Sequence, residues 1–317
     1  MRLYQLNRQA ERYKQERAQK KASPWKLGGL GPVTLGKRVW GQIGEDEVLT
    51  RSAALSYYFI SALVPMLFFL LAVLGMFAKS HDLQSRLFSD AGRFVPPDAF
   101  RLLQKILMEI AGRSSGLKLV FGVVLALWAA SGGVSSIMDA LNRCYHVKDS
   151  RPYTTQRLIS LGLTIAISAL TIVALVIVLY GGNIAEFVGA HTGLSSITIL
   201  VWQAAQWPVA FFFLVVAFAL MYYWGPDVEQ QWQWITPGSL VGVVTWLAAS
   251  ILLRGYLHYF NSFSKTYGSL GAVIVLLLWL YITGMAILIG GEINSEIENA
   301  AAERGHPEAK PEGKKVA

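Results

Sequence analysis

Six long stretches of this chain contain no Asp, Glu, Lys or Arg, although the sequence holds 28 basic and 20 acidic residues. Each stretch has at least 20 residues, and ~20 apolar residues in a helix cross the ~30 Å hydrocarbon layer of a bilayer. A helix on a soluble core needs only one apolar face, whereas these are apolar all round. The pattern therefore predicts an integral membrane protein. The six stretches are Ser52–Ala78, Leu119–Met138, Leu158–Ala185, Phe187–Pro226, Gln230–Leu253 and Thr266–Gly291.

The predicted fold is an all-α integral membrane protein with six transmembrane helices and amphipathic surface helices. Residues 1–51 form a basic cytoplasmic arm that ends in an interfacial helix, 52–298 the membrane domain and 299–317 a disordered cytoplasmic tail. The segment 79–118 is predicted to be an external amphipathic segment. The predicted spans are 53–78, 119–138, 158–182, 198–224, 237–256 and 267–291.

The distribution of basic residues predicts that both termini are cytoplasmic. With six spans, 19 of the basic residues fall on the side of the termini and 9 on the other side, and positive charge marks the cytoplasmic side. The first external connection departs from the rule because it carries 7 basic residues. We interpret the net charge of +8 as an orientation signal and not as a nucleic-acid-binding surface.

A polar stripe at one end of the second predicted span is the first candidate site. Its members recur at steps of three and four and therefore share a helix face, and Gly132 and Gly133 beside it allow close helix approach. One interpretation is a vestibule facing the cytoplasm that contacts a polar head group or ion. The other is a hydrogen-bonded seam between helices, and the residues alone leave both open. The stripe consists of Ser131, Ser135, Asp139 and Asn142, with Arg143 at its end.

A second candidate is the external turn before the sixth span. It contains Tyr267, Gly268, Ser269 and Gly271, and aromatic residues near this level match the interfacial belt of membrane proteins. At the other end of that span, Glu292 and Glu296 are predicted to emerge into the cytoplasm. Short echoes between the first and last three spans also suggest an inverted repeat, but coincidence among apolar segments is the favoured explanation.

Enzyme signatures are missing from the sequence. It contains no P-loop, no H-E-x-x-H, no G-x-S-x-G and no dinucleotide fingerprint, and the five histidines are scattered. The chain has one cysteine, Cys144, which excludes an internal disulfide. We therefore predict no catalytic residues, no metal site and no cofactor.

Three long motifs and one short segment form a recognisable pattern. The motifs read L-T-R-S-A-A-L-S-Y-Y-F-I-S-A-L-V-P from Leu49, L-W-A-A-S-G-G-V-S-S-I-M-D-A-L-N-R-C-Y-H-V-K-D-S-R-P-Y from Leu127, and Y-G-S-L-G-A-V-I-V-L-L-L-W-L-Y-I-T-G-M-A-I-L-I-G-G-E-I-N-S-E-I-E from Tyr267, and the short segment reads W-I-T-P-G-S-L from Trp234. Together they resemble the YihY/BrkB family of bacterial inner-membrane proteins. Where the family usually has a small residue after L-N-R, this chain has Cys144. The resemblance implies a six-span protein of the bacterial cytoplasmic (inner) membrane. It also implies a link to envelope integrity, and in one member to serum resistance.

Three functional hypotheses follow. The leading one is a transporter or flippase-like protein for a lipid or amphiphilic envelope component, with membrane lipids as partners and a path between spans 1, 2, 5 and 6. The second is a scaffold that recruits envelope-assembly proteins through the segment 79–118. The third is a ribonuclease, because the family has carried the label ribonuclease BN, although no cluster of acidic residues or histidines here suits metal or water activation.

Overall fold

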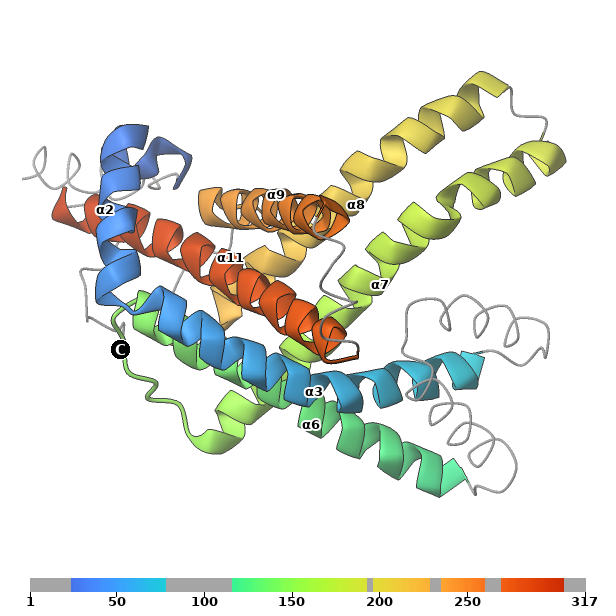
Figure 1. Cartoon of the computed structure of the whole chain (residues 1–317), viewed down its shortest axis with the longest axis horizontal. Coiled ribbons are helices and arrows are strands. Elements are labelled where there is room, and N and C mark those ends of the chain that lie inside the picture. Colours follow the sequence, from blue (N-terminus) through green and yellow to red (C-terminus); the bar gives the residue numbers. More distant parts are fainter. Residues whose placement is uncertain (1–23, 78–115, 193–195, 229–234, 260–268, 305–317) are drawn as a thin grey trace, which may run out of the picture.

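A computed structural model describes residues 24–77, 116–192, 196–228, 235–259 and 269–304, and these residues form helices and no strand. A short 3-10 helix, η1, precedes seven α-helices (Figure 1). The arm 1–23, most of the segment 79–118 and the tail from residue 305 lie outside the described residues. The elements are η1 (Pro24–Gly29), α2 (Pro32–Glu45), α3 (Val48–Phe77), α6 (Gly116–Cys144), α7 (Tyr153–Thr192), α8 (Ser196–Trp224), α9 (Pro237–Tyr259) and α11 (Ser269–Glu303).

The six longest helices coincide with the six uncharged runs, because a segment that is apolar all round satisfies its backbone groups internally in lipid only as a helix. Among the described residues, four stretches are long and apolar enough to cross a bilayer. The other two predicted spans correspond to α3 and α6, and the count of six spans stays a prediction. The four stretches are Tyr153–Val178, Val201–Trp224, Pro237–Tyr256 and Val273–Glu303.

The six long helices pack in a ring that follows their order in the chain. Each contacts the next, in the order α3, α6, α7, α8, α9, α11, and α11 returns to α3. Figure 1 shows α2 lying across one end of this ring, which we call the α2 end. The α3–α6 and α7–α8 pairs diverge from one another as they run away from it (Figure 1). The first and last described helices meet at the α2 end, where η1 and α2 pack on α11.

The best-packed part of the described chain lies near the α2 end. Leu141 of α6, Tyr222 of α8 and Leu288 of α11 are almost completely buried and belong to one apolar cluster. The Tyr222 hydroxyl donates a 2.8 Å hydrogen bond to the Ile287 carbonyl, which links α8 to α11 across the ring. We call this meeting point of α6, α8 and α11 the closed seam.

Two glycines let α9 and α11 touch beside the closed seam. A Cβ atom built on Gly290 would lie 2.6 Å from the Gly238 carbonyl oxygen and would also meet the Tyr222 hydroxyl. A Cβ atom on Gly238 would meet the Gly290 carbonyl oxygen and lie 2.5 Å from Asn294 Oδ1. Small residues allow this close backbone approach between membrane helices.

Helix α7 is longer than the predicted third span. It continues through Gly181 and Gly182 to Thr192 because α8 packs against these glycines. The Trp202 indole donates a 2.8 Å hydrogen bond to the Gly181 carbonyl, and a Cβ atom on Gly181 would lie 2.6 Å from Gln206 Oε1. The Gly-Gly pair is therefore a contact between helices and does not end α7.

The segment predicted to lie at the membrane interface is a helix, α2, but part of its apolar face packs on protein. Leu35 and Val39 are buried against Ile293 and Ile297 of α11. Trp40 points away from this contact and is 77 % exposed. One face of α2 therefore belongs to the folded domain, and another remains free for the membrane surface.

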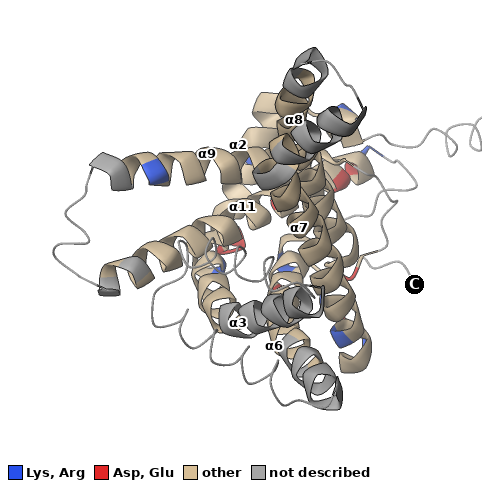
Figure 2. Cartoon of the chain, turned by 90° about the vertical axis from the view of Figure 1, so that its right-hand side faces the viewer, with Lys and Arg blue, Asp and Glu red and all other residues tan. Residues whose placement is uncertain are grey.

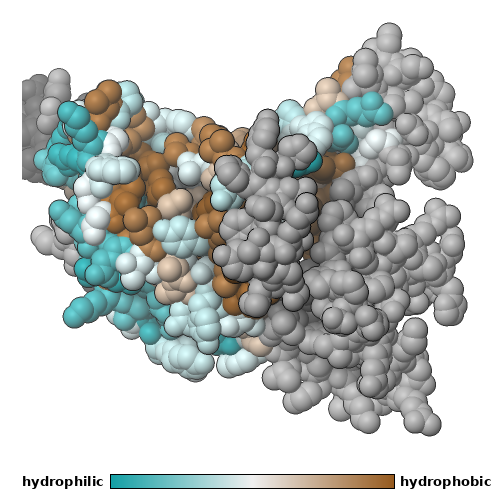
Figure 3. All heavy atoms as spheres, viewed as in Figure 1, coloured by the Kyte–Doolittle hydropathy of each residue, from teal (hydrophilic) through white to brown (hydrophobic). Residues whose placement is uncertain are grey.

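The surface away from the α2 end suits lipid. Many large apolar side chains on α7, α8, α9 and α11 are exposed, among them Ile172, Trp207, Leu252 and Ile274. Figure 2 shows that the described stretches of the long helices carry few charged residues. In Figure 3 hydrophilic residues gather toward the α2 end and hydrophobic ones cover the neighbouring helices. These features establish a membrane protein with several apolar helices.

Candidate functional site

The stripe predicted on α6 begins in a helix contact. Ser131 is fully buried, and its hydroxyl donates a 2.7 Å hydrogen bond to the Trp128 carbonyl of its own helix. Gly133 faces α3, where a built Cβ atom would lie 3.3 Å from the Ala62 Cβ atom. Ser135 is half-buried. Ser131 and Ser135 lie on the opposite side of α6 from Gly133, because a step of two residues turns a helix by about 200°.

Asn142 joins α6 to two loops. It is 4 % exposed, and its side-chain amide donates a 3.0 Å hydrogen bond to Asp149 Oδ2. Its carbonyl oxygen accepts a 2.6 Å hydrogen bond from the backbone N–H of Asp227. Asp227 in turn accepts two 2.7 Å hydrogen bonds from the backbone N–H and hydroxyl of Ser150. Asn142 therefore fixes the α6–α7 loop to the chain that leaves α8.

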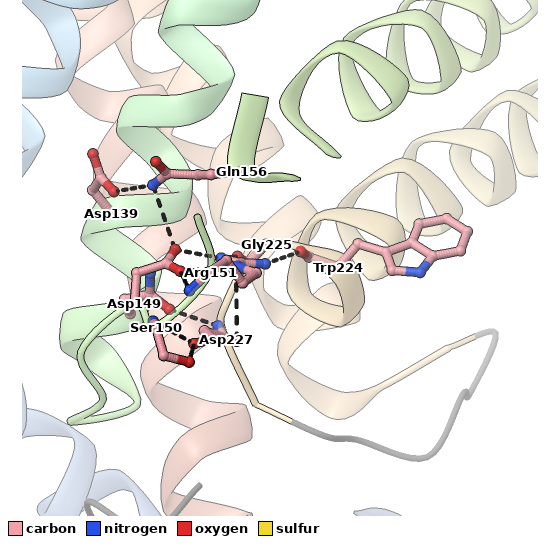
Figure 4. A network of polar contacts seen from close by, with 9 residues as sticks. Asp139, Asp149, Ser150, Arg151, Gln156, Trp224, Gly225 and Asp227 are labelled. Atoms are coloured by element: carbon pink, nitrogen blue, oxygen red, sulfur yellow. Dashed lines mark hydrogen bonds and ion pairs between the residues drawn. The ribbon is translucent and has the colours of Figure 1, made fainter. Parts of the chain in front are cut away.

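Arg151 lies at the centre of these contacts (Figure 4). Its guanidinium donates to Asp149 at 2.6 Å and 2.9 Å, and to the carbonyls of Trp224 at 3.3 Å and Gly225 at 2.9 Å. The last carbonyls of α8 have no partner within the helix, so a cation there also complements the helix dipole. We call the set Asn142, Asp149, Ser150, Arg151 and Asp227 the loop network.

Asp139 lies at the edge of the loop network. Its side chain is exposed and accepts a 2.9 Å hydrogen bond from the Gln156 amide, which also lies 3.4 Å from Asp149 Oδ2 (Figure 4). Partial burial acts to raise the pKa of Asp149, but the hydrogen bonds from Arg151 outweigh it and lower that pKa below its ordinary value. Asp149 is thus held as a carboxylate facing the Arg151 guanidinium.

Arg143 points to a different partner from Asn142, because adjacent helix residues are 100° apart. Its Nε atom lies 3.3 Å from Asp46 Oδ1, and His146 Nε2 lies 3.0 Å from Asp46 Oδ2. Asp46, between α2 and α3, is 1 % exposed. Burial raises the pKa of Asp46, although the charges of His146, Arg143 and Arg51 oppose the shift. The predicted stripe is therefore divided between two polar groups.

Backbone strain accumulates around Asp46. Glu47, the next residue, has φ of 53°, and His146, its partner, has φ of 50°. This left-handed conformation costs a residue other than glycine roughly 1–2 kcal/mol. Because the residue after Asp46 and the partner of Asp46 both adopt this conformation, we infer that the surrounding packing imposes it.

The prediction that Glu292 and Glu296 emerge into the cytoplasm is wrong. Glu292 is 0 % exposed and Glu296 is 5 % exposed, because α11 continues to Glu303 and is covered by η1, α2 and α6. The Cys144 thiol, also fully buried, lies beside Glu292 and 4.0 Å from the Leu288 carbonyl. Periodicity gives no signal for this burial, because the covering elements come from distant parts of the chain. We call Asp46, Arg143, Cys144, His146 and Glu292 the acidic pocket.

The second predicted site lies mostly outside the part of the chain that the structure describes. Tyr267 and Gly268 fall in the gap before α11, Ser269 is the first residue of that helix, and Gly271 is buried in its first turn. The role of this turn stays a prediction.

The described polar groups contact helix ends and one another. Within the described ranges, no group of three or more His, Cys, Asp or Glu residues is arranged to hold a metal ion. Between α2 and α11 lies an open groove of about 520 Å³, lined by Arg38, Gln42, Glu45, Glu296 and Glu303 among others. Arg38 spans it with hydrogen bonds of 3.0 Å and 3.1 Å to the Glu303 carboxylate.

Comparison with known proteins places this arrangement in a family. Residues 39–314 match the family described as virulence factor BrkB. The ribonuclease-like protein YfkH of Bacillus subtilis (strain 168) is 32 % identical over 259 residues, which cover 82 % of this chain and 93 % of that protein. The UPF0761 membrane protein Smlt0865 of Stenotrophomonas maltophilia (strain K279a) is 26 % identical over 276 residues, or 84 % of this chain.

A UPF0761 membrane protein of Xanthomonas oryzae pv. oryzae (strain PXO99A) is 26 % identical over 291 residues, or 87 % of this chain. The chain spans 61 % of the length of the Stenotrophomonas protein and 63 % of the length of the Xanthomonas protein. No solved structure matches the chain. The ribonuclease-like name belongs to one relative, whereas the UPF0761 relatives are named as membrane proteins. The family match over most of the chain agrees with the resemblance in its three motifs and with its apolar helices, so the chain is a member of the BrkB family of membrane proteins.

Proposed function

We propose that this protein is a transporter or flippase-like protein that moves a lipid or other amphiphile across the bacterial cytoplasmic membrane. The observation that carries the proposal is the ring of six long helices in chain order. The ring is packed tightly at the closed seam, and the helix pairs diverge away from it (Figure 1). A bundle that is closed at one end and widens into the bilayer gives an amphiphile lateral access.

The polar residues of α6 support a path for a head group. Asp139 and Arg143 have exposed side chains at the α2 end, and Ser135 is half-buried one turn further into α6. By the positive-inside distribution of charge, the α2 end is the cytoplasmic end. In this proposal Asp139 and Arg143 contact the head group there. The buried Asn142 holds the loop network beside Asp139, and Asp46 holds Arg143.

Reconstitution tests the proposal. Purified protein in vesicles with a fluorescent phospholipid should speed movement of the probe between leaflets, measured as the fraction that external dithionite bleaches. The double variant Asp139→Ala and Arg143→Ala should lose this activity at unchanged incorporation. Arg38→Gln is the matched control, because it removes an exposed charge at the same end. Wild-type vesicles that bleach no faster than protein-free vesicles would reject the proposal.

A scaffold for envelope assembly is the second candidate, and the segment 79–118 favours it. This segment carries 7 basic residues in a connection that the charge rule expects to be poor in them. A scaffold would lose function when the segment is exchanged for a neutral linker of equal length, and its purified form would move no lipid in the vesicle assay.

A further inference from the structure

Glu292 is a buried carboxyl group with which no cation among the described residues forms an ion pair. Both of its oxygens are buried and accept no hydrogen bond from a described N–H or O–H group. The polar group beside it is the Cys144 thiol of α6. Burying an ionised carboxylate costs several kcal/mol unless a cation or several hydrogen bonds compensate. A neutral, protonated carboxyl group avoids most of that cost.

Two negative side chains also lie near Glu292. Asp46, from the α2–α3 junction, and Glu296, one turn further along α11, both place negative charge nearby. The basic side chains of this region face other groups. Arg143 and Arg51 act on Asp46, His146 Nε2 lies 3.0 Å from Asp46 Oδ2, and Arg38 faces Glu296 and Glu303. The Cys144 thiol is the group that faces Glu292 from α6.

Glu292 also lies at a contact that has to separate if the closed seam opens. Its neighbour Gly291 packs on α6, where a built Cβ atom would lie 2.7 Å from Leu141 Cδ2 and 3.8 Å from Cys144 Sγ. Leu141, Cys144 and Leu288 around it are all fully buried. A negative charge at this position would draw water into an otherwise apolar contact.

We propose that Glu292 is a proton-binding site and that release of its proton opens the closed seam between α6 and α11. The ligand is the proton, because the group offers two carboxyl oxygens beside a thiol and the described residues form no set of three metal-ligating side chains there. The further statement that proton release drives transport rests on the proposed function. The opening of the closed seam does not depend on that function.

The native Cys144 reports on the opening, since it is the chain's one cysteine and is 0 % exposed beside Glu292. The experiment measures its modification by N-ethylmaleimide in the full-length reconstituted protein from about pH 6 to about pH 9, the range that spans known buried glutamates. Each rate is divided by the rate in denatured protein at the same pH, because maleimide reacts with the thiolate. We expect the ratio to rise by up to about tenfold per pH unit and then to saturate.

Three variants sharpen the test. Glu292→Gln should hold the ratio low and flat. Asp46→Asn removes a negative charge and leaves its cations facing the pocket, so the rise should move to lower pH. The matched control is Ser160→Cys in a Cys144→Ala background, which places a thiol at a 0 % exposed position on α7 and should show no rise.

A flat wild-type profile would overturn the proposal even if Glu292→Gln could not be purified. An equal rise in Glu292→Gln or in the Ser160→Cys control would do the same, because it would show general loosening of the bundle. A rise that depends on Glu292 in protein that moves no lipid would keep the proton site and reject the transport proposal. Lipid movement together with a flat pH profile of Cys144 modification would keep the transport proposal and reject the proton site.

Discussion

Replacing Gly290 by alanine should disrupt the contact of α9 with α11 and, through Tyr222, that of α8. The added Cβ atom would lie 2.6 Å from the Gly238 carbonyl oxygen and 2.9 Å from Tyr222 Cζ. The Gly238 carbonyl belongs to the backbone and cannot rotate away. Tyr222 is 1 % exposed and would have to give up the hydrogen bond from its hydroxyl to the Ile287 carbonyl.

The magnitude follows from three contributions. Overpacking a tight contact costs about 1–3 kcal/mol, and a lost hydrogen bond costs about 0.5–1.5 kcal/mol. Alanine in place of a helical glycine returns about 0.5–1 kcal/mol. The free energy of unfolding of Gly290→Ala should therefore fall by about 0.5–4 kcal/mol. At roughly 2 °C per kcal/mol for a chain of this size, the Tm should fall by about 1–8 °C.

Gly132→Ala is the matched control, because a Cβ atom at Gly132 of α6 would meet nothing within 4 Å. It should keep the Tm unchanged or raise it by about 1–2 °C, since only the helix-propensity gain remains. The assay is thermal denaturation in one detergent, followed by intrinsic tryptophan fluorescence. Equal Tm values for the two variants, or a more stable Gly290→Ala protein, would refute the described packing of α8, α9 and α11.

Three further predictions concern polar contacts. Asn142→Ala should lower the free energy of unfolding by about 1–3 kcal/mol because two hydrogen bonds are lost, and denaturation in detergent measures it. The pKa of Asp149 is lowered by Arg151, so its contribution to stability is present above the unfolded-state pKa, ~3.9, and is lost as pH falls through the folded-state value. Wild-type Tm should therefore fall more steeply on acidification than that of Asp149→Asn, and parallel curves would contradict this. Glu303→Gln breaks the exposed pair with Arg38 and should change stability by less than about 1 kcal/mol in the same assay.

The sequence was sufficient to predict the helices, because the signal is local. A run without charge that is long enough to cross a bilayer has few ways to satisfy its backbone. The extent of α7 was not predictable in this way, since glycine weakens an isolated helix. Gly181 is retained within α7 because Trp202 and Gln206 of α8 pack on it.

The polar sites depend on partners that are remote in sequence. The spacing correctly placed Asp139 and Asn142 near the end of α6, but the partners of Asn142 lie in the loops before α7 and after α8. Glu292 looked like the first residue beyond a membrane span. Its burial results from η1, α2 and α6 covering that end of α11, which no pattern within α11 records.

The chain should cross the membrane repeatedly with its α2 end in the cytoplasm. Two single cysteines in a Cys144→Ala background test it in intact cells: Lys148→Cys, exposed in the α6–α7 loop, and Ser195→Cys, in the link between α7 and α8. An impermeant maleimide added outside should label the cysteine at position 195 and reach the one at position 148 only after the cells are broken. Labelling of both positions from outside, or of neither, would refute this membrane topology.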